Sequence, residues 1–163
     1  HPGNLTDSDI QAVYGMAARE DSVKIVPSII CSKFTNLQKL WLDELAIKTV
    51  IDYSLADCKN LQDLYLGYNE ITELSSLVFA QNGNLRILDL GHNHLRSLYS
   101  DTFNSLVNLQ QLHLDHNQLE NIRFLLMSNP QLKVLNLDGN EIAYFHIGNF
   151  ERNINLEVLK VNR

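Results

Sequence analysis

Apolar and polar residues follow one recurring block, L-x-x-L-x-L-x-x-N-x-L, from residue 37 to the end of the sequence. The first leucine of each copy falls at 37, 61, 85, 109, 132 and 156, so the period is 24 residues with one interval of 23. A fixed period of this length is the signature of a solenoid, in which neighbouring coils bury each other's apolar faces. We therefore expect one domain over residues 1–163, with repeats over 23–163.

The L-x-L core of each block predicts a short β-strand, because alternate side chains of a strand point to opposite faces. Stacked coils place these strands about 4.8 Å apart in a parallel sheet on the concave face. The expected fold is an α/β-type repeat solenoid whose convex side is irregular, with 3-10 and short helical turns. The second half of each repeat adds inward-facing residues at Val26, Val50, Leu74, Leu98, Ile122 and Phe145, and then at Leu55, Phe79, Phe103, Leu126 and Phe150.

An asparagine follows four of the predicted strands, at Asn69, Asn93, Asn117 and Asn140. The chain turns at this point and its backbone groups lose their ladder partners, so a buried amide that both donates and accepts can satisfy them. We expect a structural role for these asparagines. The first block has Leu45 at the same position.

Residues 1–22 precede this register, and two interpretations of them stand. Val13, Met16 and Ala18 occupy the leucine positions of a degenerate first repeat. The same stretch is also typical of a short amphipathic helix that covers the first coil, with Asp7 or Ser8 as its N-cap. Residues 1–22 are therefore either an N-terminal cap or a degenerate repeat.

Composition and charge narrow the possible partners. The formal net charge is −6 and the chain has no run of Lys or Arg, so nucleic acid and anionic membranes are not favoured. No apolar run approaches the roughly 20 residues that a membrane span requires. The motifs of a nucleophile elbow and a phosphate loop are also missing, so we expect neither an enzyme nor a cofactor.

These repeats resemble the typical 24-residue class of extracellular leucine-rich repeat proteins, such as Toll-like receptor ectodomains, over roughly residues 23–163. The segments IICSKFTNLQKLWL and LADCKNLQDLYLGYNEI further resemble the N-terminal repeats of secreted leucine-rich repeat immune proteins of insects, particularly mosquitoes. The resemblance implies a secreted protein that binds protein partners in innate immunity. An alternative is a structural or adhesive fragment of a receptor ectodomain. The chain lacks the multi-cysteine N-terminal cap of many such receptors and the coiled-coil region of many of the insect proteins.

Two cysteines and one sequon bear on this extracellular interpretation. In the repeat register, Cys31 takes the position of Phe79 and Phe103, while Cys58 takes that of Leu106, so both face the core. They are either two buried thiols that pack as small apolar groups or a disulfide that clamps the first two coils. Their three-residue offset makes the geometry marginal, and the extracellular resemblance favours the disulfide. Asn4 begins the single N-glycosylation sequon.

The outward residues of the predicted strands offer a binding surface. Between the second and third leucines lie Trp41, Tyr65, Asp89, His113, Asn136 and Lys160, and three residues later lie Glu44, Tyr68, His92, His116 and Gly139. Exposed aromatic side chains on a rigid sheet are typical of partner recognition, although cross-strand packing that shields the sheet would also produce them. We expect a protein partner to bind Trp41, Asp43, Glu44, Tyr65, Tyr68, Asp89, His92, His113, Asp115 and His116.

The histidines on this surface allow three interpretations. His92 and His116 share a column in adjacent coils, and His113 stands beside Asp89, so imidazoles and a carboxylate could converge on a metal ion. No recognised ligand spacing supports such a site, which favours solvated surface histidines and no bound metal. A contact surface that responds to pH is the third interpretation. His94 points to a different side of the chain.

The last copy of the block stops inside its strand. Leu156, Leu159 and Val161 would then expose an edge of the core to solvent. We expect this edge to be covered, either by further residues of a longer chain or by a second copy in an end-to-end homodimer.

Overall fold

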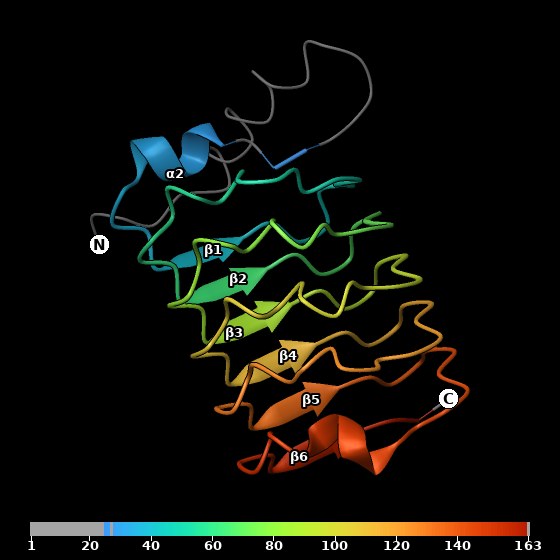
Figure 1. The fold of residues 1–163 in the computed structure, drawn as a ribbon. Helices are drawn as coiled ribbons and strands as arrows, with labels where there is room; N and C mark the ends of the chain where they lie inside the picture. The colour runs from blue at the N-terminus through green and yellow to red at the C-terminus, as the bar shows by residue number, and fades with distance from the viewer. Residues whose placement is uncertain (1–24, 27, 163) are drawn as a thin grey trace.

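The computed structural model describes residues 25, 26 and 28–162, so the interpretations of residues 1–22 and of Asn4 lie outside the described residues. Within these it contains six short strands: β1 (Lys39–Trp41), β2 (Asp63–Tyr65), β3 (Ile87–Asp89), β4 (Gln111–His113), β5 (Val134–Asn136) and β6 (Val158–Lys160). They form one parallel sheet in the order β1-β2-β3-β4-β5-β6, and each coil stacks on the one before it (Figure 1). The predicted repeat solenoid is confirmed.

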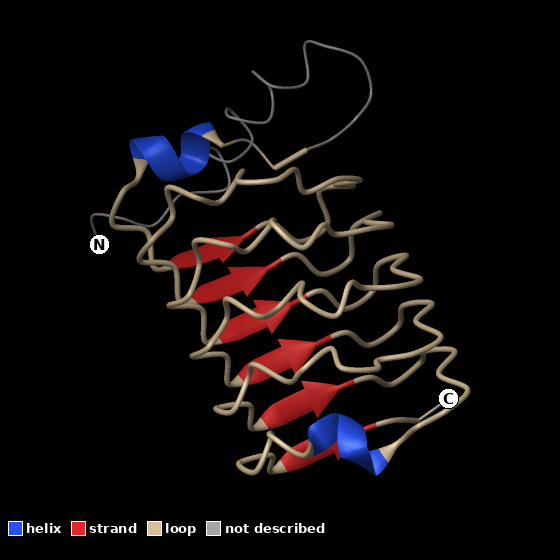
Figure 2. Ribbon diagram, viewed as in Figure 1, coloured by secondary structure: helices blue, strands red, loops and turns tan. Residues whose placement is uncertain are grey.

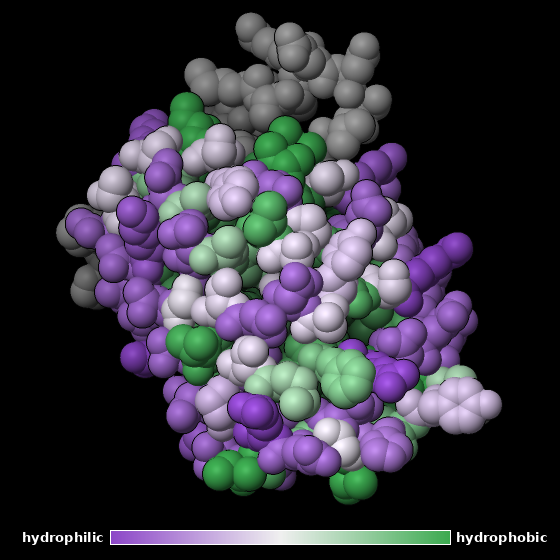
Figure 3. All heavy atoms as spheres, in the orientation of Figure 1, coloured by the Kyte–Doolittle hydropathy of each residue, from purple (hydrophilic) through white to green (hydrophobic). Residues whose placement is uncertain are grey.

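The core is a stack of equivalent leucines. In-register pairing aligns the central residues of the strands, which are Leu40, Leu64, Leu88, Leu112, Leu135 and Leu159. The first five are buried, and burying one leucine side chain stabilises a fold by about 1.5–3 kcal/mol. The last described coil is covered on one side only, so Leu159 is 40% exposed. Hydrophobic side chains accordingly reach the surface at the β6 end (Figure 3).

The asparagine after each strand ties neighbouring coils together. Asn93 donates through Nδ2 to the carbonyl oxygens of Leu66 and Leu90, at 2.9 and 3.1 Å. Its Oδ1 accepts from the Ile71 backbone N–H at 3.0 Å. The same arrangement recurs around Asn69, Asn117 and Asn140. These amides form hydrogen bonds with backbone groups that would otherwise be buried without a partner. A buried polar group without a partner lowers the stability of a fold.

A second asparagine column lies on the other side of the coil, and sequence reasoning missed it. Asn82 and Asn129 are fully buried, and each donates through Nδ2 to two carbonyl oxygens of a preceding coil. Asn153 does the same one coil later. The column shares its register with Cys58 and Leu106, so the repeat spacing alone contained the signal.

The convex side is built from turns and loops, with short helices near its two ends (Figure 2). These helices are α2 (Ile29–Lys33) and the 3-10 helix η1 (Ile147–Phe150). Phe79 and Phe103 are buried here and stack with their ring centroids 6.1 Å apart. The inward placement predicted for Phe145 was wrong, because its side chain is 41% exposed and stacks on the half-buried Phe150 at the surface of the last described coil.

Cys31 and Cys58 are joined in a disulfide that links α2 to the segment before β2. Their Cα atoms lie 4.7 Å apart, inside the range that a disulfide spans without backbone movement. The bond closes a loop with a sequence separation of 27, for which loss of unfolded-state entropy corresponds to roughly 3.5 kcal/mol. The first two coils are therefore clamped covalently.

Candidate functional site

The sheet face, which we define as the surface formed by the outward side chains of β1–β5 and of the turns that follow them, begins with an aromatic pair. Trp41 and Tyr65 are in-register partners on β1 and β2, and their rings stack with centroids 5.4 Å apart and planes within 1° of parallel. Trp41 nevertheless keeps 46% of its surface exposed. The pair presents a large, rigid apolar surface to solvent.

An aromatic column, consisting of Tyr68, His92 and His116, runs beside this pair along the turns. The ring centroids are 4.1 Å apart between Tyr68 and His92 and 4.2 Å apart between His92 and His116. All three residues have positive φ, between 50° and 54°. This left-handed backbone turns the chain before each buried asparagine, and it aims the three side chains the same way. The column therefore follows from the asparagine ladder beneath it.

Gly139 occupies the next place in this column and leaves room for the ring of His116. A Cβ atom at this position would lie 2.6 Å from His116 Nδ1, and its φ of +66° is strained for any residue with a side chain. The glycine thus ends the aromatic column and fixes where the second imidazole lies.

Carboxylates border the column on its strand side. Asp43 accepts a hydrogen bond from the Gly67 backbone N–H at 2.8 Å, and Asp89 accepts one from the Gly91 backbone N–H at 2.9 Å. Partial burial raises the pKa of the Asp43 carboxyl, the hydrogen bond from Gly67 opposes that rise, and the nearby charge of Asp89 adds to it. The centre of the sheet face is therefore acidic.

One ion pair on these strands was missed by sequence reasoning. Lys39 Nζ lies 2.6 Å from Asp63 Oδ2, and Asp63 is almost fully buried. The hydrogen bond and the charge of Asp63 raise the pKa of Lys39, and burial raises the pKa of the neighbouring Tyr65 phenol. Lys39 and Asp63 are one 24-residue period apart and pair in register, so the repeat spacing could have predicted the ion pair.

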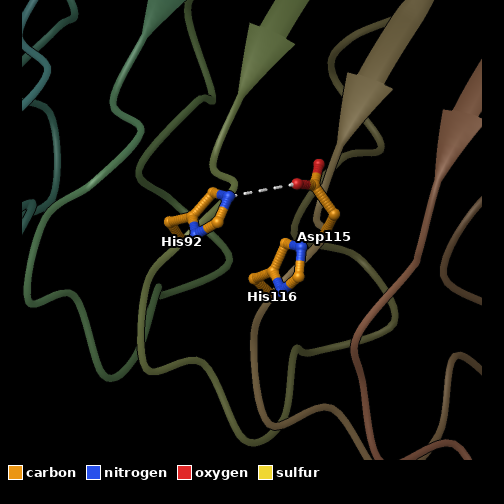
Figure 4. Close-up of side chains that lie close together, drawn as sticks. All are labelled: His92, Asp115 and His116. Carbon is orange, nitrogen blue, oxygen red and sulfur yellow. Dashed lines mark ion pairs between the residues drawn. The ribbon is translucent and has the colours of Figure 1, made fainter. Parts of the chain in front are cut away.

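The structure assembles a different histidine group from the one that the sequence suggested. His92 Nε2 lies 3.7 Å from Asp115 Oδ2 of the following coil, and His116, the neighbour of Asp115 in the sequence, lies beside them (Figure 4). One ligand atom of each of these residues lies within 4.8 Å of the other two. His113 projects from β4 and pairs in register with Asp89, and it is not part of the group. Asp115, not Asp89, is therefore the carboxylate beside the two stacked imidazoles.

The other predicted binding residues lie around these features. Glu44 begins the turn column with a φ of 58° and is exposed, although it is not in the aromatic stack. His94 is exposed beside Thr72, Arg96 and Gln118, away from the histidine group. In the part of the chain that the structure describes, no helix is both long and apolar enough to traverse a bilayer.

Comparison with solved structures identifies similar solenoids. A chain in the crystal structure of an LRIM1/APL1C complex is 25% identical with a TM-score of 0.75, and the alignment covers 84% of this chain and 25% of that chain. The Toll–Spatzle complex, described as a hub in Drosophila development and innate immunity, gives 29% identity, a TM-score of 0.74, and coverage of 85% and 20%. An internalin C2 from Listeria monocytogenes gives 29% identity, a TM-score of 0.70, and coverage of 83% and 55%.

The chain thus spans about half or less of the length of the solved proteins that it matches. None of the curated protein sequences compared with it matches. The sequence pattern of the family Leucine rich repeat matches residues 35–95 and 60–119, which together span more than half of the 163 residues. The repeat period, the stacked strands and this match lead to one conclusion: the chain belongs to the leucine-rich repeat family.

Proposed function

We propose that this chain is a non-enzymatic protein-binding module of a secreted or extracellular protein with a role in innate immunity, and that its sheet face binds the partner. One observation carries the proposal, namely the exposed aromatic pair Trp41 and Tyr65 beside the aromatic column. The proposed contact residues are Trp41, Asp43, Glu44, Tyr65, Tyr68, Asp89, His92, His113, Asp115 and His116.

The physical case rests on preorganisation. Trp and Tyr side chains bury a large area in a contact at a small entropy cost, and they dominate the energetics of protein interfaces. Trp41 and Tyr68 are 46% and 59% exposed, and stacking on a neighbouring coil already holds each ring in place. A partner that covers them therefore gains area without having to order the rings first.

The charge of the same surface indicates the chemistry of the partner. Asp43, Asp89 and Asp115 are partly exposed at its centre, and Glu44 is exposed at its edge. The nearby Lys39 is already paired with Asp63. We infer that the partner presents Lys or Arg side chains to the acidic centre and an apolar group to Trp41, an arrangement that favours specificity and fast association.

The comparisons support recognition of proteins. LRIM1/APL1C and Toll–Spatzle are complexes, and this chain is similar to leucine-rich repeat chains within them. The innate-immune role printed for the Toll–Spatzle complex favours a similar setting for this chain. The bacterial internalin, however, has a comparable TM-score, so the fold itself is compatible with several biological settings.

The proposal is tested by capture of partners from extracellular fluid of the source organism. We expect the Trp41→Ala/Tyr68→Asn double variant to lose at least about tenfold in partner affinity, as removal of interface hot spots does. Asparagine is chosen because it tolerates the positive φ of Tyr68. The matched control is Tyr99→Ala/Tyr144→Ala, which removes two tyrosines that are 65% and 87% exposed outside the strands. Equal loss in both variants, or in neither, would contradict a specific role for the sheet face.

A second copy of the chain is an alternative partner. Val158 and Leu159 are each 40% exposed on β6, and Ile154 beside them is 84% exposed. End-to-end stacking through this edge would bury them against an equivalent surface. Light scattering of the wild type and of Leu159→Asp tests it, because a dimer that becomes a monomer in the variant would support the edge contact. A monomeric wild type would remove this alternative.

A further inference from the structure

We propose that His92, Asp115 and His116 bind a single Zn²⁺ ion at the edge of the sheet face. This site goes beyond the proposed binding of a protein partner. The three residues come from two consecutive coils, and within the described residues they are the one group of at least three potential ligands whose atoms come this close together. The inference rests on their geometry, on the contacts that orient them and on the ligand preferences of zinc.

The separations of the ligand atoms are near those of a zinc site. Zinc binds imidazole nitrogen and carboxylate oxygen at about 2.0–2.2 Å in a tetrahedral arrangement, which puts ligand atoms roughly 3.3 Å from one another. His92 Nε2 and Asp115 Oδ2 are 3.7 Å apart, and all three ligand atoms lie within 4.8 Å of one another. Closing the group around an ion therefore requires shifts of about 1 Å.

The rings already face the correct side. One nitrogen of each imidazole is turned toward the Asp115 carboxylate (Figure 4). The two ring planes are inclined by 21°, so their in-plane lone pairs run nearly side by side. To direct both lone pairs at one point, each ring turns about its Cα–Cβ and Cβ–Cγ bonds and gives up part of its stacking on the other.

Neighbouring contacts hold the three residues in place. The backbone N–H of His92 donates to the Asp115 carbonyl at 2.8 Å, and that of His116 donates to the Asp138 carbonyl at 2.7 Å. Asn136 Nδ2 donates to Asp115 Oδ1 at 2.8 Å, which orients the carboxylate and leaves Oδ2 toward His92. Supporting contacts of this kind around a ligand strengthen metal binding.

The chemistry of the group selects the ion. Imidazole nitrogen together with one carboxylate suits Zn²⁺ and related transition metals, whereas Ca²⁺ and Mg²⁺ prefer sites made of oxygen ligands. Only 17% of the Asp115 side chain is exposed, so its attraction for a cation is less screened than at a fully solvated site. Two histidines and an aspartate leave a fourth position for water or for a donor from another molecule.

Equilibrium dialysis of the full chain against Zn²⁺ tests the site. We expect one equivalent of Zn²⁺ to bind, and we expect His92→Asn/His116→Asn to weaken that binding by more than about tenfold, since loss of a merely supporting residue already costs that much. Asparagine suits the positive φ at both positions. The matched control, His94→Asn/His113→Asn, removes two histidines outside the group and should change binding less than about twofold.

Imidazole nitrogen chemical shifts of the wild type provide a readout that does not depend on any variant folding. Zn²⁺ should shift the ring nitrogens of His92 and His116 and leave those of His113 and His94 in place. No uptake of Zn²⁺, equal binding by the His92/His116 variant, or shifts confined to other histidines would overturn the proposal. These measurements use no protein partner, so their outcome is independent of the proposed function.

Discussion

The two faces of the six-stranded sheet follow the repeat to different degrees. On the inner face the central strand position is leucine in every coil. On the outer face, the residue that follows this leucine is Trp41, Tyr65, Asp89, His113, Asn136 and Lys160 in turn. An inner side chain packs between two equivalent neighbours and must match their volume, whereas an outer side chain meets solvent. The proposed contacts with a partner therefore lie at the positions at which the period carries no information.

The largest effect on stability is expected when one of the buried asparagines that follow the strands is replaced. Replacing Asn93 with Ala leaves the Ile71 N–H and the Leu66 carbonyl buried without this partner. We expect the free energy of unfolding to fall by about 3–5 kcal/mol. Urea denaturation measures it. Asn84→Ala is the control, because exposed Asn84 also reaches back to a preceding coil, and its loss should cost under about 1 kcal/mol.

Removing the disulfide between Cys31 and Cys58 should destabilise the first two coils of the solenoid. Replacing Cys31 and Cys58 together with Ala should lower the free energy of unfolding by roughly 3.5 kcal/mol, the value for the closed loop, with a smaller addition from lost packing. Denaturation of this variant and of the chemically reduced wild type should give similar midpoints below that of the oxidised protein. An unchanged midpoint would show that the clamp does not limit unfolding.

Replacing Gly139 with Ala should perturb the outer face and lower stability by less than the two preceding changes. An alanine there adopts an unfavourable left-handed backbone at a cost of about 1–2 kcal/mol, and its Cβ displaces the ring of His116. We expect a modest fall in thermal stability together with a large change in the imidazole signals of His116. Gly83→Ala serves for comparison, since its φ lies outside the positive range. A shift in His116 caused by both variants would argue against a local effect.

The smallest effect is expected at Asp43, which is partly buried on the sheet face. The folded-state pKa of its carboxyl is raised above the ordinary value of 3.8, so the charged form is disfavoured by folding. Its contribution to stability is therefore full below the unfolded pKa and is lost as pH rises through the folded pKa. Asp43→Asn should be equal to the wild type at pH 3 and more stable by up to about 0.5 kcal/mol at pH 7. A larger stability advantage of the variant at pH 3 than at pH 7 would contradict a raised folded-state pKa at Asp43.

The fold was predictable because the inner face repeats. The first leucine of each block gave the register of all six strands, and the structure has the same strand order and pairing. The prediction that Phe145 faces inward was wrong because the repeat pattern describes a coil with neighbours on both sides. No described coil covers the far side of the coil that contains Phe145. The column that contains Asn82 was missed because Cys58 and Leu106 interrupt it, so asparagine does not recur in every coil.

The candidate site was predictable only in part. The sequence placed His92 and His116 in one column and Asp89 beside His113, and the structure has both arrangements. It did not single out Asp115 as the carboxylate beside the two stacked imidazoles. Contacts across coils at this edge depend on the left-handed turn before each asparagine, which rotates the side chain away from the simple alternation of a strand. The sequence repeat shows which residues share a column, and the backbone angles determine which of their side chains are in contact.

The disulfide near the first strand also sets how the molecule responds to mechanical force. Coils contact only their neighbours along the stack, so a pull applied at the two ends would peel them apart one after another. The crosslink between Cys31 and Cys58 withholds the 27 residues of its loop from extension. At about 3.5 Å per residue, a stretched oxidised chain would end roughly 90 Å shorter than a reduced one.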